Sequence, residues 1–219
     1  MITFESIKND KQIKIYIKKA DESLAALGYT EHCFPHVTKV AHTAKNILLT
    51  LGYSKRDAEL AQIAGYLHDI GNIINREDHA QSGALMAFRL LDKLGTGAEE
   101  IATIIAAIGN HDEGTAVAVN PVAAALILAD KTDVRRTRVR NSDFATFDIH
   151  DRVNYAVVKS TTTISEDKTT FILNINIDTK ISAVMDYFEI FLGRMLLCRK
   201  AAEKLNVKFQ LVINDQIVL

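Results

Sequence analysis

The sequence predicts a mainly α-helical bundle over residues 1–150 and a small C-terminal α+β appendage over residues 151–219. Two observations predict this class. In the first part, apolar residues recur at helical spacing between capping residues and glycines. After about residue 150, β-branched residues alternate with polar ones, which is typical of strands. We therefore expect the appendage to contain antiparallel strands and one helix.

The first three helices are expected from their boundary residues. Gly28 is a natural stop for the first, and Pro35 opens the second, where a proline loses no intrahelical hydrogen bond. Ser54 and Asp57 form a capping pair for the third, which stops at Gly71. The expected spans are about residues 7–27, 35–52 and 54–69.

Three more helices follow before the pattern changes from helical to strand-like at about residue 150. Gly95 ends the fourth helix, and Thr96 with Glu99 makes a capping-box pattern for the fifth. Asn120 followed by Pro121 opens a long sixth helix. The expected spans are about residues 78–94, 96–110 and 121–138.

The appendage contains two alternating segments, residues 155–164 and 169–177, with a polar turn between them. A helix over residues 182–205 and a strand over 207–213 are expected to follow. The second segment gathers its apolar residues on one face, which is too regular to be left in water; these residues are Phe171, Leu173, Ile175 and Ile177. We therefore expect the appendage to cover the helical part or to join two copies into a homo-oligomer.

Composition and charge narrow the class of protein. The chain has 219 residues, 48% hydrophobic and 24% charged, and its net charge is −1. No global field favours nucleic acid, so a nucleic-acid partner is not expected. No stretch approaches the ~20 apolar residues that cross a bilayer. The two cysteines, Cys33 and Cys198, lie far apart and fit reduced thiols, so we expect a cytoplasmic protein with no membrane partner.

The most informative pattern is the pair His68-Asp69, preceded by His36 and followed by Asp130. Imidazole nitrogens and carboxylate oxygens are ligands for divalent metals. Neighbouring residues point about 100° apart around a helix, so two adjacent ligands diverge within a straight helix. A position in the last turn, just before Gly71, makes that divergence easier to accommodate.

This order of residues resembles the HD superfamily of metal-dependent phosphohydrolases, which is named after the His-Asp pair. The resemblance covers about residues 30–140. It implies an HD-domain helical bundle that hydrolyses a phosphorylated small molecule by metal-activated water, and it favours a nucleotide as the substrate. No serine or cysteine nucleophile is implied.

His79 and His111 extend the resemblance to the HD proteins that hold two metal ions. The resemblance implies that Asp69 bridges the ions, that the first is held by His36, His68 and Asp130, and that the second is held by His79 and His111. Mixed histidine and carboxylate ligation does not select one metal, so one or two ions of Fe, Mn, Mg, Co or Zn are expected. The alternative for His79 and His111 is a capping or core role.

Within this two-metal branch, some groups hydrolyse diadenosine tetraphosphate and others cleave cyclic dinucleotides. The second activity is disfavoured here, because Asn72 stands where those enzymes carry lysine. Asp112 follows His111 where they carry a second histidine, and the GYP-type signature is absent from the sequence. The substrate class therefore stays open within phosphorylated small molecules.

Three further residues are candidates for the reaction itself. Lys131 and Arg138, on nearly one azimuth of the expected sixth helix, could grip a phosphate by charge-assisted hydrogen bonds. The alternative is a solvated basic helix end, balanced by Asp133. Asp112 is a candidate proton acceptor because it is next to His111.

Two plainer interpretations stand beside the enzyme: a metal-binding sensor or assembly module, and a purely structural helical protein, which would require no bound metal. His32, His42 and His150 are expected to be packed or solvent-facing rather than ligands. The whole chain could be a catalytically silent sensor or assembly module that keeps a metal site and uses its C-terminal sheet as the interaction surface. Absence of activity towards every nucleotide would favour this alternative.

Overall fold

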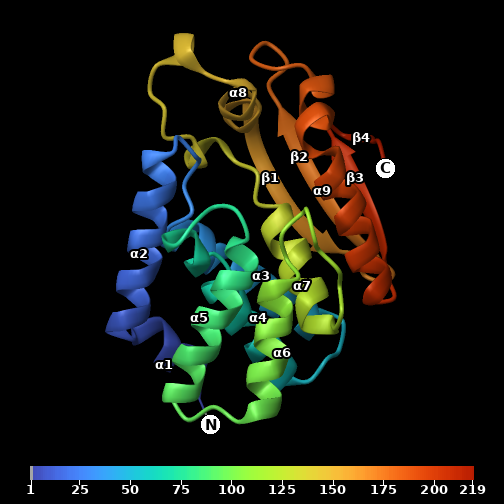
Figure 1. Ribbon diagram of the computed structural model, residues 1–219. Helices are drawn as coiled ribbons and strands as arrows, with labels where there is room; N and C mark the ends of the chain where they lie inside the picture. The colour runs from blue at the N-terminus through green and yellow to red at the C-terminus, as the bar shows by residue number, and fades with distance from the viewer. Residues whose placement is uncertain (1) are drawn as a thin grey trace.

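The computed structural model describes residues 2–219 and divides into a helical part and a sheet-containing part that pack against each other (Figure 1). The helical part consists of α1 (Phe4–Asn9), α2 (Lys11–Ala26), α3 (Phe34–Thr50), α4 (Lys55–Leu67), α5 (His79–Lys93), α6 (Ala98–Gly109) and α7 (Pro121–Lys131). The rest consists of α8 (Ile149–Ala156), β1 (Val157–Ile164), β2 (Thr170–Ile177), α9 (Val184–Lys204), β3 (Lys208–Ile213) and β4 (Gln216–Ile217). The expected class, a helical bundle with a small α+β appendage, is confirmed.

Capping side chains set the starts of several helices. The Ser54 side chain accepts from the Asp57 backbone N–H at α4, and Asn120 caps α7 in the same way. Both caps are as expected. The first expected helix is instead two, because Asp10 leaves the helical conformation after α1 and caps α2.

Two expected boundaries are wrong. The Thr96–Glu99 capping box does not form: Gly97 is the N-cap of α6, and the Thr96 hydroxyl is turned into the protein. The sixth expected helix, α7, ends at Lys131 rather than near Arg138. The chain turns there because Asp133 is buried in ion pairs with Lys39 and Arg135. Only a short 3₁₀ helix, Arg136–Arg138, follows.

Helix α7 lies at the centre of the fold. Its residues from Val122 to Ala129 are all buried, and it packs against α3, α4, α6 and α9. A helix that is apolar all round must be covered on every side. Its C-terminal end is therefore held firmly, and that end carries Asp130.

The sheet has the strand order β1-β2-β3-β4. The expected hairpin forms, since β1 and β2 are antiparallel around residues 165–168, and β4 is antiparallel to β3. Strands β2 and β3 are parallel, whereas antiparallel strands were expected. The reason is that α9 connects them and carries the chain back to the end of the sheet at which β2 begins, so β3 runs in the same direction.

The apolar face of β2 is buried within the chain itself. Phe171, Leu173 and Ile175 are at most 1% exposed. Helix α9 crosses in front of β2 and β3 (Figure 1) and also packs on α7. One continuous apolar core therefore joins the two parts, and the appendage covers the helical bundle, as one of the two expectations for it stated.

Candidate metal centre

The expected ligands come from the ends of five helices that point toward one place. His36 lies in the first turn of α3, and His79 is the first residue of α5. His68 directly follows α4, and Asp69 has already left the helix with φ −96° and ψ 1°. This exit from the helix lets adjacent side chains face the same centre. His111 follows α6, and Asp130 is near the end of α7.

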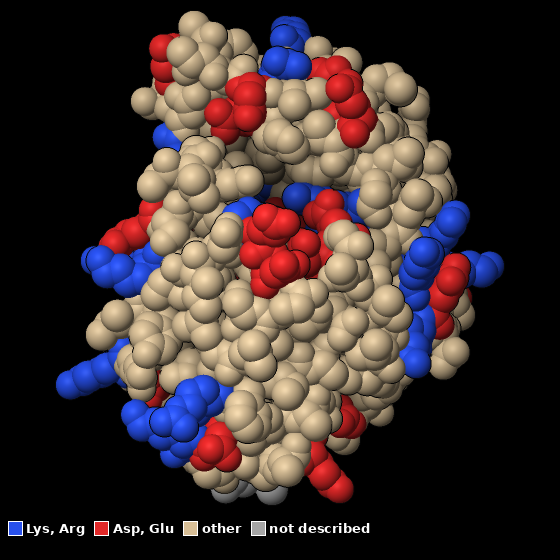
Figure 2. Space-filling view, in the orientation of Figure 1, with Lys and Arg blue, Asp and Glu red and all other residues tan. Residues whose placement is uncertain are grey.

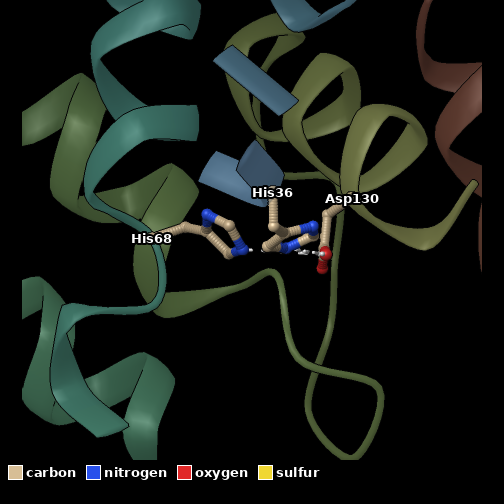
Figure 3. A group of neighbouring side chains, drawn as sticks. All are labelled: His36, His68 and Asp130. Atoms are coloured by element: carbon tan, nitrogen blue, oxygen red, sulfur yellow. Dashed lines mark ion pairs between the residues drawn. The ribbon is translucent and has the colours of Figure 1, made fainter. Parts of the chain in front are cut away.

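The first cluster consists of His36, His68 and Asp130 (Figure 3). The Oδ1 atom of Asp130 lies 3.4 Å from Nε2 of His36 and 3.6 Å from Nε2 of His68. Asp69 closes this cluster from another side, because its Oδ2 lies 3.2 Å from Nε2 of His68. Three helices thus bring two imidazoles and two carboxylates together.

The second cluster uses the other oxygen of Asp69. Its Oδ1 lies 3.5 Å from Nε2 of His79 and 3.9 Å from Nε2 of His111. The two imidazole Nε2 atoms are 3.3 Å apart. Asp69 therefore presents one oxygen to each cluster, so it could contribute a ligand to a cation in either one.

Each histidine is held by its Nδ1 atom, which leaves Nε2 aimed at the centre. Nδ1 of His36 lies 2.8 Å from Oδ2 of the buried Asp133. The other three Nδ1 atoms face backbone carbonyls: His68 faces Gly65, His79 faces Arg76, and His111 faces Ile108. An outer partner of this kind selects the tautomer and the orientation that a metal ligand needs.

The donor atoms fit a divalent cation. Nε2 of His36, Nε2 of His68 and Oδ2 of Asp69 are buried, and none has a hydrogen-bond partner among the described residues. Buried polar atoms are normally paired, because an unpaired one costs free energy. A cation bound by these nitrogen and oxygen atoms removes that cost.

The charges of the clusters also favour a bound cation. Burial by itself lowers the pKa of His68, but the carboxylates of Asp69 and Asp130 outweigh it and raise the pKa to about 10. For His111, burial and the nearby His68 lower the pKa to about 3. Without a cation, a proton on His68 therefore balances part of the buried carboxylate charge, and a bound metal takes the place of that proton.

Of the three candidate reaction residues, Lys131 and Asp112 contact cluster residues, whereas Arg138 contacts Asp133 behind His36. Nζ of Lys131 is 2.9 Å from Oδ2 of Asp130, the oxygen turned away from the histidines. Arg138 is buried, and its Nε and Nη1 donate to backbone carbonyls. A solvated basic helix end is therefore the wrong interpretation of both cations. Asp112 lies 3.9 Å from Nε2 of His79.

Several residues that sequence reasoning missed complete the site. Asp133, expected only to balance basic neighbours, is the outer partner of His36. Nη1 of Arg76 lies 3.3 Å from Nε2 of His79. Asn72, which replaces the lysine of related motifs, donates to Oδ1 of Asp69 at 3.0 Å. The motif after His68-Asp69 drew attention to Asn72 only as a departure from lysine, and no spacing signal in the sequence singles out Arg76 or Asp133.

A cavity of about 390 Å³ opens over the clusters. Figure 2 shows the hollow on this face, with Lys or Arg atoms inside it and Asp or Glu atoms beside it. The helical part lines it with Asp69, His79, His111 and Asp130, and the appendage lines it from α8 and α9. His32 and His150, which carry no ligand signal in the sequence, also line it.

Comparison with known proteins gives the family. Residues 34–135 match the family model described as HD domain. The chain contains an HD domain. This domain defines a superfamily of metal-dependent phosphohydrolases that use divalent metals. The matched residues include each expected metal ligand, and the resemblance found in the sequence is confirmed at this level.

Outside that domain the comparisons are sparse. The chain is 27% identical over 162 residues to an uncharacterised protein of Methanocaldococcus jannaschii. The similarity covers 64% of this chain and 62% of the relative, so it spans less than two thirds of the relative's length. Among the described residues, no helix beside the HD domain or within it is long and apolar enough to span a membrane.

Proposed function

We propose that this protein is a metal-dependent phosphohydrolase that acts on a phosphorylated small molecule, with a nucleotide as the favoured substrate class. The observation that carries the proposal is the position of Asp69, whose Oδ2 lies 3.2 Å from Nε2 of His68 and whose Oδ1 lies 3.5 Å from Nε2 of His79, between two adjoining histidine clusters. HD proteins are generally hydrolases, although some are not catalytic. A cavity of about 390 Å³ over the clusters is large enough for a ligand of nucleotide size.

The six expected ligands would hold one or two divalent cations of Fe, Mn, Mg, Co or Zn. When bound in such a cluster, divalent cations lower the pKa of water and neutralise charge on phosphate oxygens. The chain's own residues supply the rest. Asp133 orients His36, and Asn72 fixes one oxygen of Asp69. Lys131 holds the outer oxygen of Asp130, which keeps the inner oxygen aimed at the first cluster.

Cationic side chains would bind the substrate phosphate. Arg76 and Lys131 line the cavity beside the second and first clusters, respectively. Charge-assisted hydrogen bonds from such groups are about twice as strong as neutral ones. Asp112 stands beside His79 with a side chain one third exposed, and it is our candidate for accepting a proton from water or passing it to solvent.

The test is a screen for phosphate release over nucleotides and simple phosphate esters, with each divalent metal added in turn. We expect turnover that chelation abolishes and metal restores. In heavy-oxygen water the label should enter the phosphoryl product, because the chain needs no covalent intermediate. Asp69→Asn should reduce turnover by at least about a hundredfold, since it replaces one of the two carboxylate oxygens by an NH2 group and removes the negative charge next to both clusters.

The contrary result is equally concrete. Wild-type protein that binds metal fully and hydrolyses no substrate with any metal would favour the catalytically silent sensor. Turnover that survives chelation, or that Asp69→Asn leaves intact, would contradict the mechanism itself. The free Cys33 and Cys198 agree with action in the reducing cytoplasm, where we propose that the protein works.

A further inference from the structure

We propose that Arg194, on helix α9 of the appendage, is a specificity residue that receives a second anionic group of the substrate. This inference rests on the proposed function and deepens it. The substrate class becomes a nucleotide that carries a further phosphate besides the one hydrolysed. Residues 34–135 form the matched HD domain, so this specificity would come from outside it.

Two anchors hold the guanidinium of Arg194 in place. Its Nε lies 2.5 Å from Oε1 of Glu113, and its Cζ lies 4.5 Å from the centre of the Phe191 ring. Phe191 is itself buried. A guanidinium supported by a ring and a carboxylate loses little conformational freedom when it binds an anion.

The remaining edge of this guanidinium is available to a ligand. Arg194 lines the cavity, and its side chain is 26% exposed. Within residues 2–219, the contact of Nε with Glu113 is an ion pair that lacks hydrogen-bond geometry, and no ion pair is present at the two Nη atoms. These atoms form the fork that binds a phosphate through two parallel hydrogen bonds. The cation is thus anchored but only partly neutralised.

A second guanidinium shares the cavity with it. Arg138 lines the same space and is buried. Burial lowers the pKa of Arg138, the carboxylates of Asp133 and Asp130 raise it, and the positive charge of Arg194 lowers it. An anion that binds between the two guanidinium groups would relieve the repulsion between them. The pair is therefore suited to a group with the charge of a phosphate.

The second anion would be distinct from the phosphate at the metal ligands. Lys131 is already paired to Asp130 there, and Glu113 lies between Lys131 and Arg194 at 3.7 Å and 2.5 Å. Lys131 and Arg194 therefore share one oxygen of Glu113 and lie side by side, with Lys131 on the side of Asp130. We expect a single phosphate to bind beside the metal ligands and a second phosphate of the same substrate to reach Arg194.

The experiment compares Arg194→Gln with the wild type on three probes: a nucleoside 5′-monophosphate, the 5′-diphosphate and the 3′,5′-bisphosphate. Initial rates give kcat and KM, and calorimetry on metal-loaded protein gives Kd without any need for turnover. We expect Arg194→Gln to weaken at least one doubly phosphorylated probe by about 10-fold to 100-fold, mainly in KM and Kd. The monophosphate should change by less than about threefold.

Two variants of helix α9 serve as controls. Arg199→Gln removes an equal charge from an exposed position on the same helix and should leave every probe unchanged. Arg194→Lys keeps the charge but loses the fork, so it should recover only part of the binding. Metal content and thermal midpoint should stay constant across all variants.

The outcomes separate this inference from the proposed function. If no probe is hydrolysed but Arg194→Gln selectively weakens a doubly phosphorylated ligand, the hydrolase proposal fails and the anion site stands. If turnover is normal and Arg194→Gln weakens the binding of all three probes equally, the assignment of Arg194 is overturned. It is also overturned if the variant weakens the binding of none of them. If Arg194→Gln does not fold, Arg194→Lys decides by the same comparison.

Discussion

At the scale of single residues, the contact between His36 and Asp133 shows how a buried carboxylate can tune a site that it does not enter. Asp133 also pairs with Lys39, Arg135 and Arg138, so its charge is shared among one imidazole and three cations. A partner of this kind typically changes metal affinity by about 10-fold to 100-fold. A substitution of Asp133 leaves all the metal ligands in place, so its effect on metal affinity can be told apart from the loss of a ligand.

We therefore expect Asp133→Asn to weaken metal binding by about tenfold or more while the chain stays folded at low temperature. Chelator competition measures the affinity, and circular dichroism checks the fold. The variant should also unfold more easily, since the buried Arg138 loses a charged partner. Asp92→Asn, at an exposed position on α5, is the matched control. Unchanged affinity in a folded Asp133→Asn protein would remove Asp133 from the site.

The raised pKa of His68 gives a prediction about protons. Its folded pKa of about 10 lies above the ordinary 6.5, so the metal-free protein carries this proton near neutral pH. The proton stabilises the metal-free fold fully below about pH 6.5, and this contribution is lost as the pH rises through about 10. Metal binding needs the neutral imidazole, so it should release about one proton near neutral pH, and affinity should rise with pH.

Calorimetric titration of the metal in two buffers with different ionisation enthalpies counts the released protons. His42→Gln should release the same number, because His42 lies outside both clusters. Binding of the cation with no proton release between pH 7 and 8 would contradict the assigned protonation of His68.

At the scale of elements, the turn between α4 and α5 sets the spacing of the two clusters. Gly71 packs so tightly on the start of α5 that an added Cβ would lie 2.0 Å from the backbone oxygen of His79 and 2.5 Å from the Gly83 nitrogen. Neither atom can yield without moving the helix. The glycine therefore brings Asp69 and His79 within reach of each other.

Gly71→Ala should destabilise the protein by roughly 3 kcal/mol or more and reduce binding of the second metal ion. Urea unfolding and elemental analysis measure the two effects. Gly193→Ala is the control, since its Cβ meets no atom within 4 Å on α9; it should stabilise by roughly 0.5–1 kcal/mol. A Gly71→Ala protein with wild-type stability would show that α5 can shift freely.

At the scale of the whole molecule, the appendage is part of both the core and the cavity. Helix α9 packs on α7, and Phe171 of β2 belongs to the same apolar cluster as the helical core. The expected self-association through the appendage stays a proposal. Any such interface would use surfaces other than the buried face of β2.

Truncation after Asp151 should therefore expose apolar surface on α7 and lower solubility or change the oligomeric state. It should also remove Phe191 and Arg194 from the cavity. Light scattering and metal analysis of the truncated and full chains make the comparison. A soluble truncation with unchanged mass and full metal content would mean that the helical part is independent of the appendage.

The sequence by itself determined the class of the fold and the set of candidate ligands. Caps such as Ser54 and Asn120 act through bonds to residues three positions away, so local sequence is sufficient to place them. The order of His36, His68-Asp69 and Asp130 similarly identified the family without any structure. The end of α7 was placed wrongly, because it depends on how Asp133 is buried by distant partners.

Only the tertiary structure decided how these residues act together. Each oxygen of Asp69 faces one cluster because the chain leaves α4 at this residue and because α5 packs on the short 3₁₀ helix that follows, Ile70–Ile73. Arg138 and Arg194 meet in one cavity although 55 residues separate them in the chain. Side-chain direction and long-range contact follow from packing, which residue spacing does not encode.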